Sequence, residues 1–245
     1  MYFPTTHWSL LARATSSGDD EARRALDELC RRYWTPVNQF VQFRGHRGAE
    51  AEDLTQEFFL HVCQHSTFAR VDRMRGRFRS FLLGALARFL GDDRDRRNAG
   101  KRGGGQTHMS LDDSSHPTAE AEAAVPPQET VAFDRAWARA IFRSALTQVR
   151  ADFTREERAE DFALLKQFLP GSGEPPSYKE AAQRMGITVA ALTSEIHRLR
   201  DAFRERVRAE VSATVSAPHE IDEEMAHLHR VLADRATAFP SENER

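Results

Sequence analysis

Hydroxyl, imidazole and guanidinium side chains recur along residues 193–204, at spacings that place them beside one another on a helix. Such groups bind DNA by donating hydrogen bonds to phosphate oxygens and to base edges. They also occur on the solvated basic face of an ordinary helical hairpin, so the local pattern leaves both interpretations open. The candidate DNA-binding residues of this segment are Thr193, Ser194, His197, Arg198, Arg200 and Arg204.

The surrounding residues predict two helices joined by a tight turn. Ser177 is followed by Glu180 at the spacing of a capping box. Gly186 suits the end of the first helix, and Thr188 suits the cap of the second. A short helix, a glycine turn and a long capped helix are typical of a helix-turn-helix, whose second helix enters the major groove of DNA. The predicted buried side of that helix is Leu192, Ile196, Leu199, Phe203 and Val207.

Polar side chains also line one side of a helix predicted for residues 50–65. Leu54, Phe58 and Val62 recur at every fourth position and form its apolar face. The polar side carries Asp53, Gln56 and Glu57. In the same helix His61 and His65 have the spacing of a metal pair, but the glutamate of a zinc motif and a third ligand are missing. We therefore expect no metal site, no cofactor and no catalytic residue.

Charge is distributed unevenly, although the net charge of the whole chain is only −2. Residues 69–102 carry a net charge of +7, residues 103–134 one of −6, and residues 209–245 one of −5. The basic blocks predict local surfaces for a polyanion rather than a uniformly basic protein. We expect weak DNA binding by the free chain unless a partner assembles these surfaces.

Helical periodicity in almost every long segment predicts an all-α fold. Residues 20–43 contain two amphipathic runs, which we expect to be broken at Thr35-Pro36. The polar, aperiodic residues 98–130 predict a flexible linker between two small helical domains. Two distant cysteines, no apolar span and no signal-peptide pattern at the start predict a cytoplasmic protein.

The order of these motifs resembles that of bacterial RNA polymerase sigma factors of the sigma-70 family, extracytoplasmic-function (ECF) type. Residues 53–59, Asp-Leu-Thr-Gln-Glu-Phe-Phe, resemble the helix that docks on the largest polymerase subunit. Residues 78–97 resemble the helix that contacts and helps to melt the minus-ten element. Residues 177–204, with Ile-His-Arg-Leu-Arg at 196–200, resemble the domain that reads the minus-thirty-five element.

The resemblance implies a role for each group of residues. Asp53, Gln56 and Glu57 would bind core RNA polymerase, the carboxylates through charge-assisted hydrogen bonds. The six residues of the predicted helix-turn-helix would read the minus-thirty-five element. Phe68 and Phe78 would stack on unpaired bases of the minus-ten element. The residues implied at the minus-ten element are Phe68, Arg73, Arg75, Arg77, Arg79 and Arg88.

The same resemblance implies the division of the chain and its function. It implies a docking and minus-ten domain, a flexible acidic linker, a minus-thirty-five domain and an acidic C-terminal helical extension, at residues 1–98, 99–131, 132–212 and 213–245. The expected function is to bring core RNA polymerase to particular promoters and to help open them, without enzymatic activity. The implied partners are core RNA polymerase, promoter DNA and an anti-sigma or other regulatory protein.

Three alternatives remain open at this level. The chain could be a stand-alone helix-turn-helix regulator, an enzyme acting on nucleic acid, or an adaptor that binds only proteins. Glu195 keeps the last of these open, because the family often has basic residues there and at Thr193. The C-terminal extension either packs on the second domain as an amphipathic helix or masks the basic recognition helix.

Overall fold

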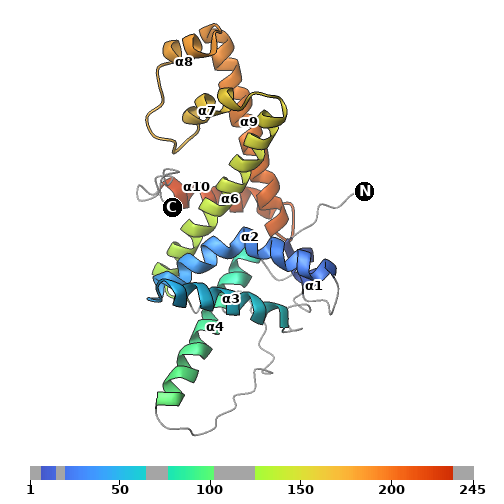
Figure 1. Cartoon of the computed structure of the whole chain (residues 1–245), viewed down its shortest axis with the longest axis vertical. Coiled ribbons are helices and arrows are strands. Elements are labelled where there is room, and N and C mark those ends of the chain that lie inside the picture. The colour runs from blue at the N-terminus through green and yellow to red at the C-terminus, as the bar shows by residue number, and fades with distance from the viewer. Residues whose placement is uncertain (1–6, 15–19, 65–76, 102–124, 234–245) are drawn as a thin grey trace. The chain divides into compact units, whose positions relative to one another are not determined.

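The computed structural model describes residues 7–14, 20–64, 77–101 and 125–233. Within these ranges the regular structure is helical and no strand occurs, which confirms the predicted all-α fold (Figure 1). None of the helices in the described ranges is long and apolar enough to cross a membrane. The chain divides into two compact units, Met1–Trp137 with Ala213–Glu220, and Ala138–Ser212 with Ile221–Arg245.

The described part of the first unit contains four helices and the start of a fifth, together with residues 213–220. The helices are α1 (His7–Ala14), α2 (Asp20–Phe43), α3 (Ala49–Gln64), α4 (Phe78–Lys101) and the beginning of α6 (Pro127–Arg155). Helices α1 and α3 both pack against α2 (Figure 1). Two glycines with positive φ, Gly45 at 102° and Gly48 at 54°, turn the chain between α2 and α3.

Helix α2 continues through Pro36, so the predicted break at Thr35-Pro36 is wrong. A proline inside a helix lacks the N–H that would bond to the carbonyl four residues earlier, which here is that of Arg32. Tyr33, Val37 and Phe40 are buried on the same side of α2 before and after the proline. Burial of this continuous apolar face outweighs the missing hydrogen bond.

The second unit contains the rest of α6 and the helices that follow it, except for residues 213–220. These helices are α7 (Ala159–Leu165), the 3₁₀ turn η3 (Lys166–Phe168), α8 (Tyr178–Met185), α9 (Val189–Thr214) and α10 (Glu220–Ala233). Phe142 of α6 packs edge-on against Phe203 of α9 with ring centroids 5.6 Å apart. The predicted apolar side of the second helix of the hairpin is buried: Leu192, Ile196, Leu199, Phe203 and Val207.

Helices α8 and α9 and the turn between them form as the sequence predicts. The Ser177 hydroxyl accepts from the backbone N–H of Glu180 at 3.2 Å, and the Glu180 carboxylate accepts from the backbone N–H of Ser177 at 3.1 Å, completing the capping box. Gly186 ends α8 in the left-handed conformation, with φ of 64°. The Thr188 hydroxyl accepts from the N–H of Ala191 at 3.1 Å and caps α9.

Replacing Ser177 with alanine is expected to destabilise α8 by about 1 kcal/mol, because the N–H of Glu180 loses its acceptor. Urea unfolding followed by far-UV circular dichroism measures this loss. Ser177→Thr keeps the hydroxyl and should stay close to the wild type. Hydrogen bonds from Ser177 also lower the pKa of Glu180 below its ordinary 4.5, so their contribution is present above that pH and is lost as the pH falls through the lowered pKa.

The compact units divide the chain differently from the predicted domains. Residues 125–137, expected to end the linker and open the second domain, pack in the first unit. Trp137 stacks on Tyr33 of α2 with ring centroids 4.8 Å apart, and Phe133 meets Phe40 edge-on at 5.8 Å. The side chains of Phe133 and Trp137 are fully buried. Aromatic packing therefore makes the beginning of α6 part of the first unit.

Candidate nucleic-acid and protein interfaces

The exposed face of α3 carries the three residues predicted to bind polymerase. Asp53, Gln56 and Glu57 are all exposed. Leu60, one turn further on, lies on the same face and is 45% exposed. Leu60 is not among the predicted docking residues, although residues seven positions apart, such as Asp53 and Leu60, lie on the same side of a helix. We call Asp53, Gln56, Glu57 and Leu60 the α3 face.

Helix α3 is held in place by contacts on its opposite side. Thr55 is buried, and its hydroxyl donates to the carbonyl of Ala51 at 2.7 Å and accepts from Asn38 Nδ2 of α2 at 3.1 Å. Phe58 meets Phe89 of α4 with ring centroids 5.7 Å apart. The contacts with Asn38 and Phe89 join α3 to α2 and α4 and thereby fix the orientation of the α3 face.

The residues predicted to contact the minus-ten element differ in their exposure to solvent. Arg88 is exposed and Arg77 is half-buried. Phe78, predicted to stack on bases, is 1% exposed and packs against Tyr33 at 5.2 Å, so that prediction is wrong. The remaining residues of the prediction, Phe68, Arg73 and Arg75, lie outside the described residues.

Arg79, also predicted to contact the minus-ten element, lies in the interior of the first unit. Its side chain is buried, 4% exposed as a residue, and its guanidinium forms an ion pair with the buried carboxylate of Asp134 at the start of α6. A charged group of each sign is thereby removed from water and held by the other. Arg79 does not face solvent in the first unit, so a contact with DNA would require this buried ion pair to open, and the predicted contact stays a prediction.

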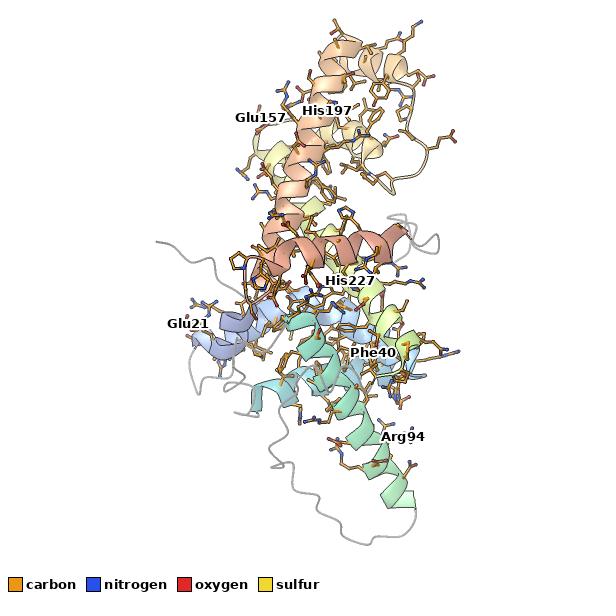
Figure 2. All side chains as sticks on the ribbon, turned by 180° about the vertical axis from the view of Figure 1, so that it is seen from behind. Glu21, Phe40, Arg94, Glu157, His197 and His227 are labelled. Atoms are coloured by element: carbon orange, nitrogen blue, oxygen red, sulfur yellow. The ribbon has the colours of Figure 1, made fainter. Side chains whose placement is uncertain are left out.

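The last turns of α4 carry acidic and basic side chains that pair with one another. Arg97 contacts Asp93 at 2.7 Å and Glu50 of α3 at 2.6 Å, and Arg96 contacts Asp93 at 3.8 Å. Arg97 and His46 lower the pKa of Glu50 below its ordinary value. Arg94, labelled in Figure 2, is exposed in the same turns. This helix end therefore combines solvated basic groups with neutralising carboxylates.

The exposed side of α9 presents four of the six predicted minus-thirty-five residues. Ser194, His197, Arg198 and Arg204 are exposed, and Figure 2 marks His197 on this helix. Thr193 is half-buried; the hydroxyls of Thr193 and Ser194 donate to the carbonyls of Val189 and Ala190. A hydroxyl bonded to its own helix in this way keeps lone pairs that can accept from a ligand.

Arg200 has a structural contact that the sequence did not reveal. Its Nε and one terminal nitrogen donate to the carbonyl of Phe168, at 3.2 and 2.9 Å. That carbonyl is at the end of η3, so Arg200 ties α9 to the connection that follows α7. Arg200 is half-buried and its guanidinium is engaged by this carbonyl, so its predicted contact with DNA stays a prediction.

Glu195 is joined to two arginines rather than directed freely at solvent. Its Oε2 lies 3.0 Å from a terminal nitrogen of Arg158, and its Oε1 lies 3.1 Å from one of Arg198. The hydrogen bond to Glu195 raises the pKa of Arg158. Arg158 lies just before α7, 37 residues from Glu195, and sequence spacing carries no signal that the two meet.

Helix α10 packs against α6 and α9 within the second unit. His229 packs edge-on against Phe142 of α6 at 6.4 Å, and Asp222 pairs with Arg208 of α9 at 2.6 Å. Leu228 and Glu224 are buried. These contacts favour the packing interpretation of the extension, and masking of the recognition residues stays a prediction.

In the described part of the chain no cluster of three or more His, Cys, Asp or Glu side chains could hold a metal ion. His61, considered above for metal binding, instead packs against Phe89 with ring centroids 5.5 Å apart. The exposed residues among the predicted sites lie on helices α3, α4 and α9.

Comparison with known families shows which kind of protein carries these helical surfaces. The family model described as "ECF sigma factor" matches residues 6–209, from the segment before α1 to near the end of α9, and stops before α10. No curated protein and no solved structure matches the chain. Members of this family act with core RNA polymerase, promoter DNA and anti-sigma factors. Because the match covers most of the sequence, the chain belongs to the ECF sigma factor family of RNA polymerase initiation factors.

Proposed function

We propose that this sigma factor docks on core RNA polymerase through the α3 face, contacts the minus-ten element through α4 and the segment before it, and reads the minus-thirty-five element through α9. The observation that carries the docking assignment is the exposure of Asp53, Gln56 and Glu57 on one face of a helix whose other face is fixed in the core. The assignment to polymerase rests on the family.

The chemistry of the α3 face suits a basic protein surface. Two carboxylates can accept charge-assisted hydrogen bonds from arginine or lysine, and an amide lies between them along the helix. Leu60 adds apolar area next to the charges. Protein interfaces commonly combine an apolar contact, which supplies affinity, with charges that select the partner.

Promoter opening in this proposal requires no catalytic group. Arg77 and Arg88, together with Arg73 and Arg75, would bind phosphates near the minus-ten element, and Phe68 would stack on an unpaired base. Capture of unstacked bases by the protein shifts the equilibrium between closed and open DNA toward the open form. Thr193, Ser194, His197, Arg198 and Arg204 would contact the minus-thirty-five element from the exposed side of α9.

Footprinting of the reconstituted holoenzyme tests this proposal. The purified chain would be mixed with core RNA polymerase and bound to promoter fragments selected from genomic upstream DNA. We expect protection of two separate elements, with permanganate-reactive thymines at the downstream one. Protection by the chain alone, with no increase on adding core enzyme and no reactive thymines, would favour the stand-alone regulator instead.

A further inference from the structure

Glu195 holds two arginines with different surroundings. One of its oxygens contacts Arg158, whose side chain is 33% exposed, and the other contacts Arg198, whose side chain is 71% exposed. The Glu195 side chain itself is only 18% exposed. The contact with Arg158 is a charge-assisted hydrogen bond, and the contact with Arg198 is an ion pair, so each carboxylate oxygen is engaged by one guanidinium group.

Arg158 is itself fixed from several directions. Its Nε donates to Asp161 at 2.9 Å, and its guanidinium carbon lies 5.0 Å from the centre of the Phe153 ring. Its backbone N–H donates to the carbonyl of Phe153 at 2.8 Å. The preceding residue, Glu157, has φ of 60°, a left-handed conformation that a non-glycine residue keeps only where the surrounding structure holds it. Figure 2 labels Glu157 at this turn.

These contacts connect the turn before α7, through Arg158 and Glu195, to the side chain of Arg198 on the exposed side of α9. The turn before α7 fixes Arg158, Arg158 fixes Glu195, and Glu195 holds the guanidinium of Arg198. An exposed arginine without such support samples many rotamers and loses entropy when it binds. Restraint before binding reduces that loss and favours one geometry of contact with a base edge.

We infer that Glu195 is a positioning residue that orients Arg198 for sequence readout in the minus-thirty-five element. The inference rests on the proposed function of α9. It assigns a role to the acidic residue that stands where a basic one is common in the family. Glu195 lowers the affinity for DNA in general through its negative charge and raises the discrimination between sites through Arg198.

The two effects of Glu195 can be separated because they act in opposite directions. In Glu195→Gln the lost negative charge tightens binding to any duplex, because the phosphates are no longer repelled. The weaker restraint on Arg198 reduces the preference for the correct sequence. We expect the affinity for unrelated duplex to rise about two- to fivefold and the preference over a single-base variant of the element to fall about tenfold.

A matched control lies further along the same helix. Asp201 pairs with Arg204 at 2.7 Å, but both side chains are well exposed, at 64% and 68%. Asp201→Asn makes the same change in charge, but the carboxylate that it removes is exposed and does not contact Arg158 or Arg198. It should raise the affinity for unrelated duplex by a similar factor and leave the sequence preference unchanged.

A second variant tests the same chain of contacts from its other end. Arg158→Gln leaves Glu195 in place but removes the group that fixes it. The preference for the correct sequence should fall as it does in Glu195→Gln, while the affinity for unrelated duplex should not rise. Circular dichroism spectra that match the wild type establish that each variant is folded.

The measurement is competition binding with holoenzyme made from the full chain and core RNA polymerase. The probes are a promoter fragment, fragments with one base changed in the minus-thirty-five element, and an unrelated duplex. Equal behaviour of Glu195→Gln and Asp201→Asn, with preference unchanged in both, would overturn the inference. If the wild-type holoenzyme shows no preference within that element, the proposed function of α9 fails, and the inference fails with it.

Discussion

Replacement of Asp134 by alanine is expected to destabilise the first unit by about 3–5 kcal/mol, because it leaves the buried guanidinium of Arg79 without its charged partner. Both side chains are almost fully removed from solvent, so water cannot replace the lost carboxylate. All three tryptophans, Trp8, Trp34 and Trp137, lie in the first unit. Urea unfolding followed by tryptophan fluorescence therefore reports the stability of this unit.

Two further variants separate a buried pair from an ordinary surface pair. Asp27→Ala breaks the exposed pair with Arg31 on α2 and should cost less than about 1 kcal/mol. Replacing both Arg79 and Asp134 with leucine removes the two charges together and should recover a large part of the lost stability. If Asp134→Ala is as stable as Asp27→Ala, the guanidinium of Arg79 is accessible to solvent. The burial of Arg79 would then no longer speak against its contact with DNA.

The variant Asp53→Ala/Glu57→Ala is expected to weaken binding to core RNA polymerase about 100-fold while leaving the fold intact. Both carboxylates are exposed, so their removal costs the free protein little, whereas each would leave a basic group of the partner unpaired in the complex. Surface plasmon resonance with immobilised core enzyme measures the change in Kd. Thermal unfolding provides the check on folding.

A neighbouring carboxylate on the same helix serves as the control. Glu52 is exposed and lies about 100° around the axis from Asp53 and one turn before Gln56, at the edge of the α3 face. Glu52→Ala should change the affinity by less than about threefold. Normal binding of Asp53→Ala/Glu57→Ala to core enzyme would show that the docking assignment is wrong.

The features predicted correctly from the sequence are those whose signals are local. Ser177 and Glu180 are three residues apart, and Gly186 marks the end of the same short helix, so no distant residue is needed to place the α8–α9 turn. The apolar periodicity of α3 likewise fixed which side of that helix faces outward. The prediction at Pro36 failed because tertiary burial outweighed a local preference.

The features that were missed depend on partners far away in the sequence. Arg79 stands in a basic block and resembles a phosphate ligand, but its partner Asp134 is 55 residues away. Residues 125–137 follow a polar linker, and nothing local indicates that Phe133 and Trp137 pack against α2. The role of Glu195 depends on Arg158 in the same way. Such pairings arise from packing between helices, which periodicity within one helix does not specify.

The central claim is that this chain directs core RNA polymerase to promoters, and transcription in vitro tests it most directly. Core polymerase would be incubated with and without the full chain on a library of genomic upstream fragments, and the 5′ ends of the transcripts would be mapped. We expect discrete transcripts that appear only with the wild-type chain, are lost with Asp53→Ala/Glu57→Ala, and begin downstream of two shared sequence elements. Identical transcripts with and without the folded chain, together with binding of the chain alone to duplex DNA, would contradict the claim.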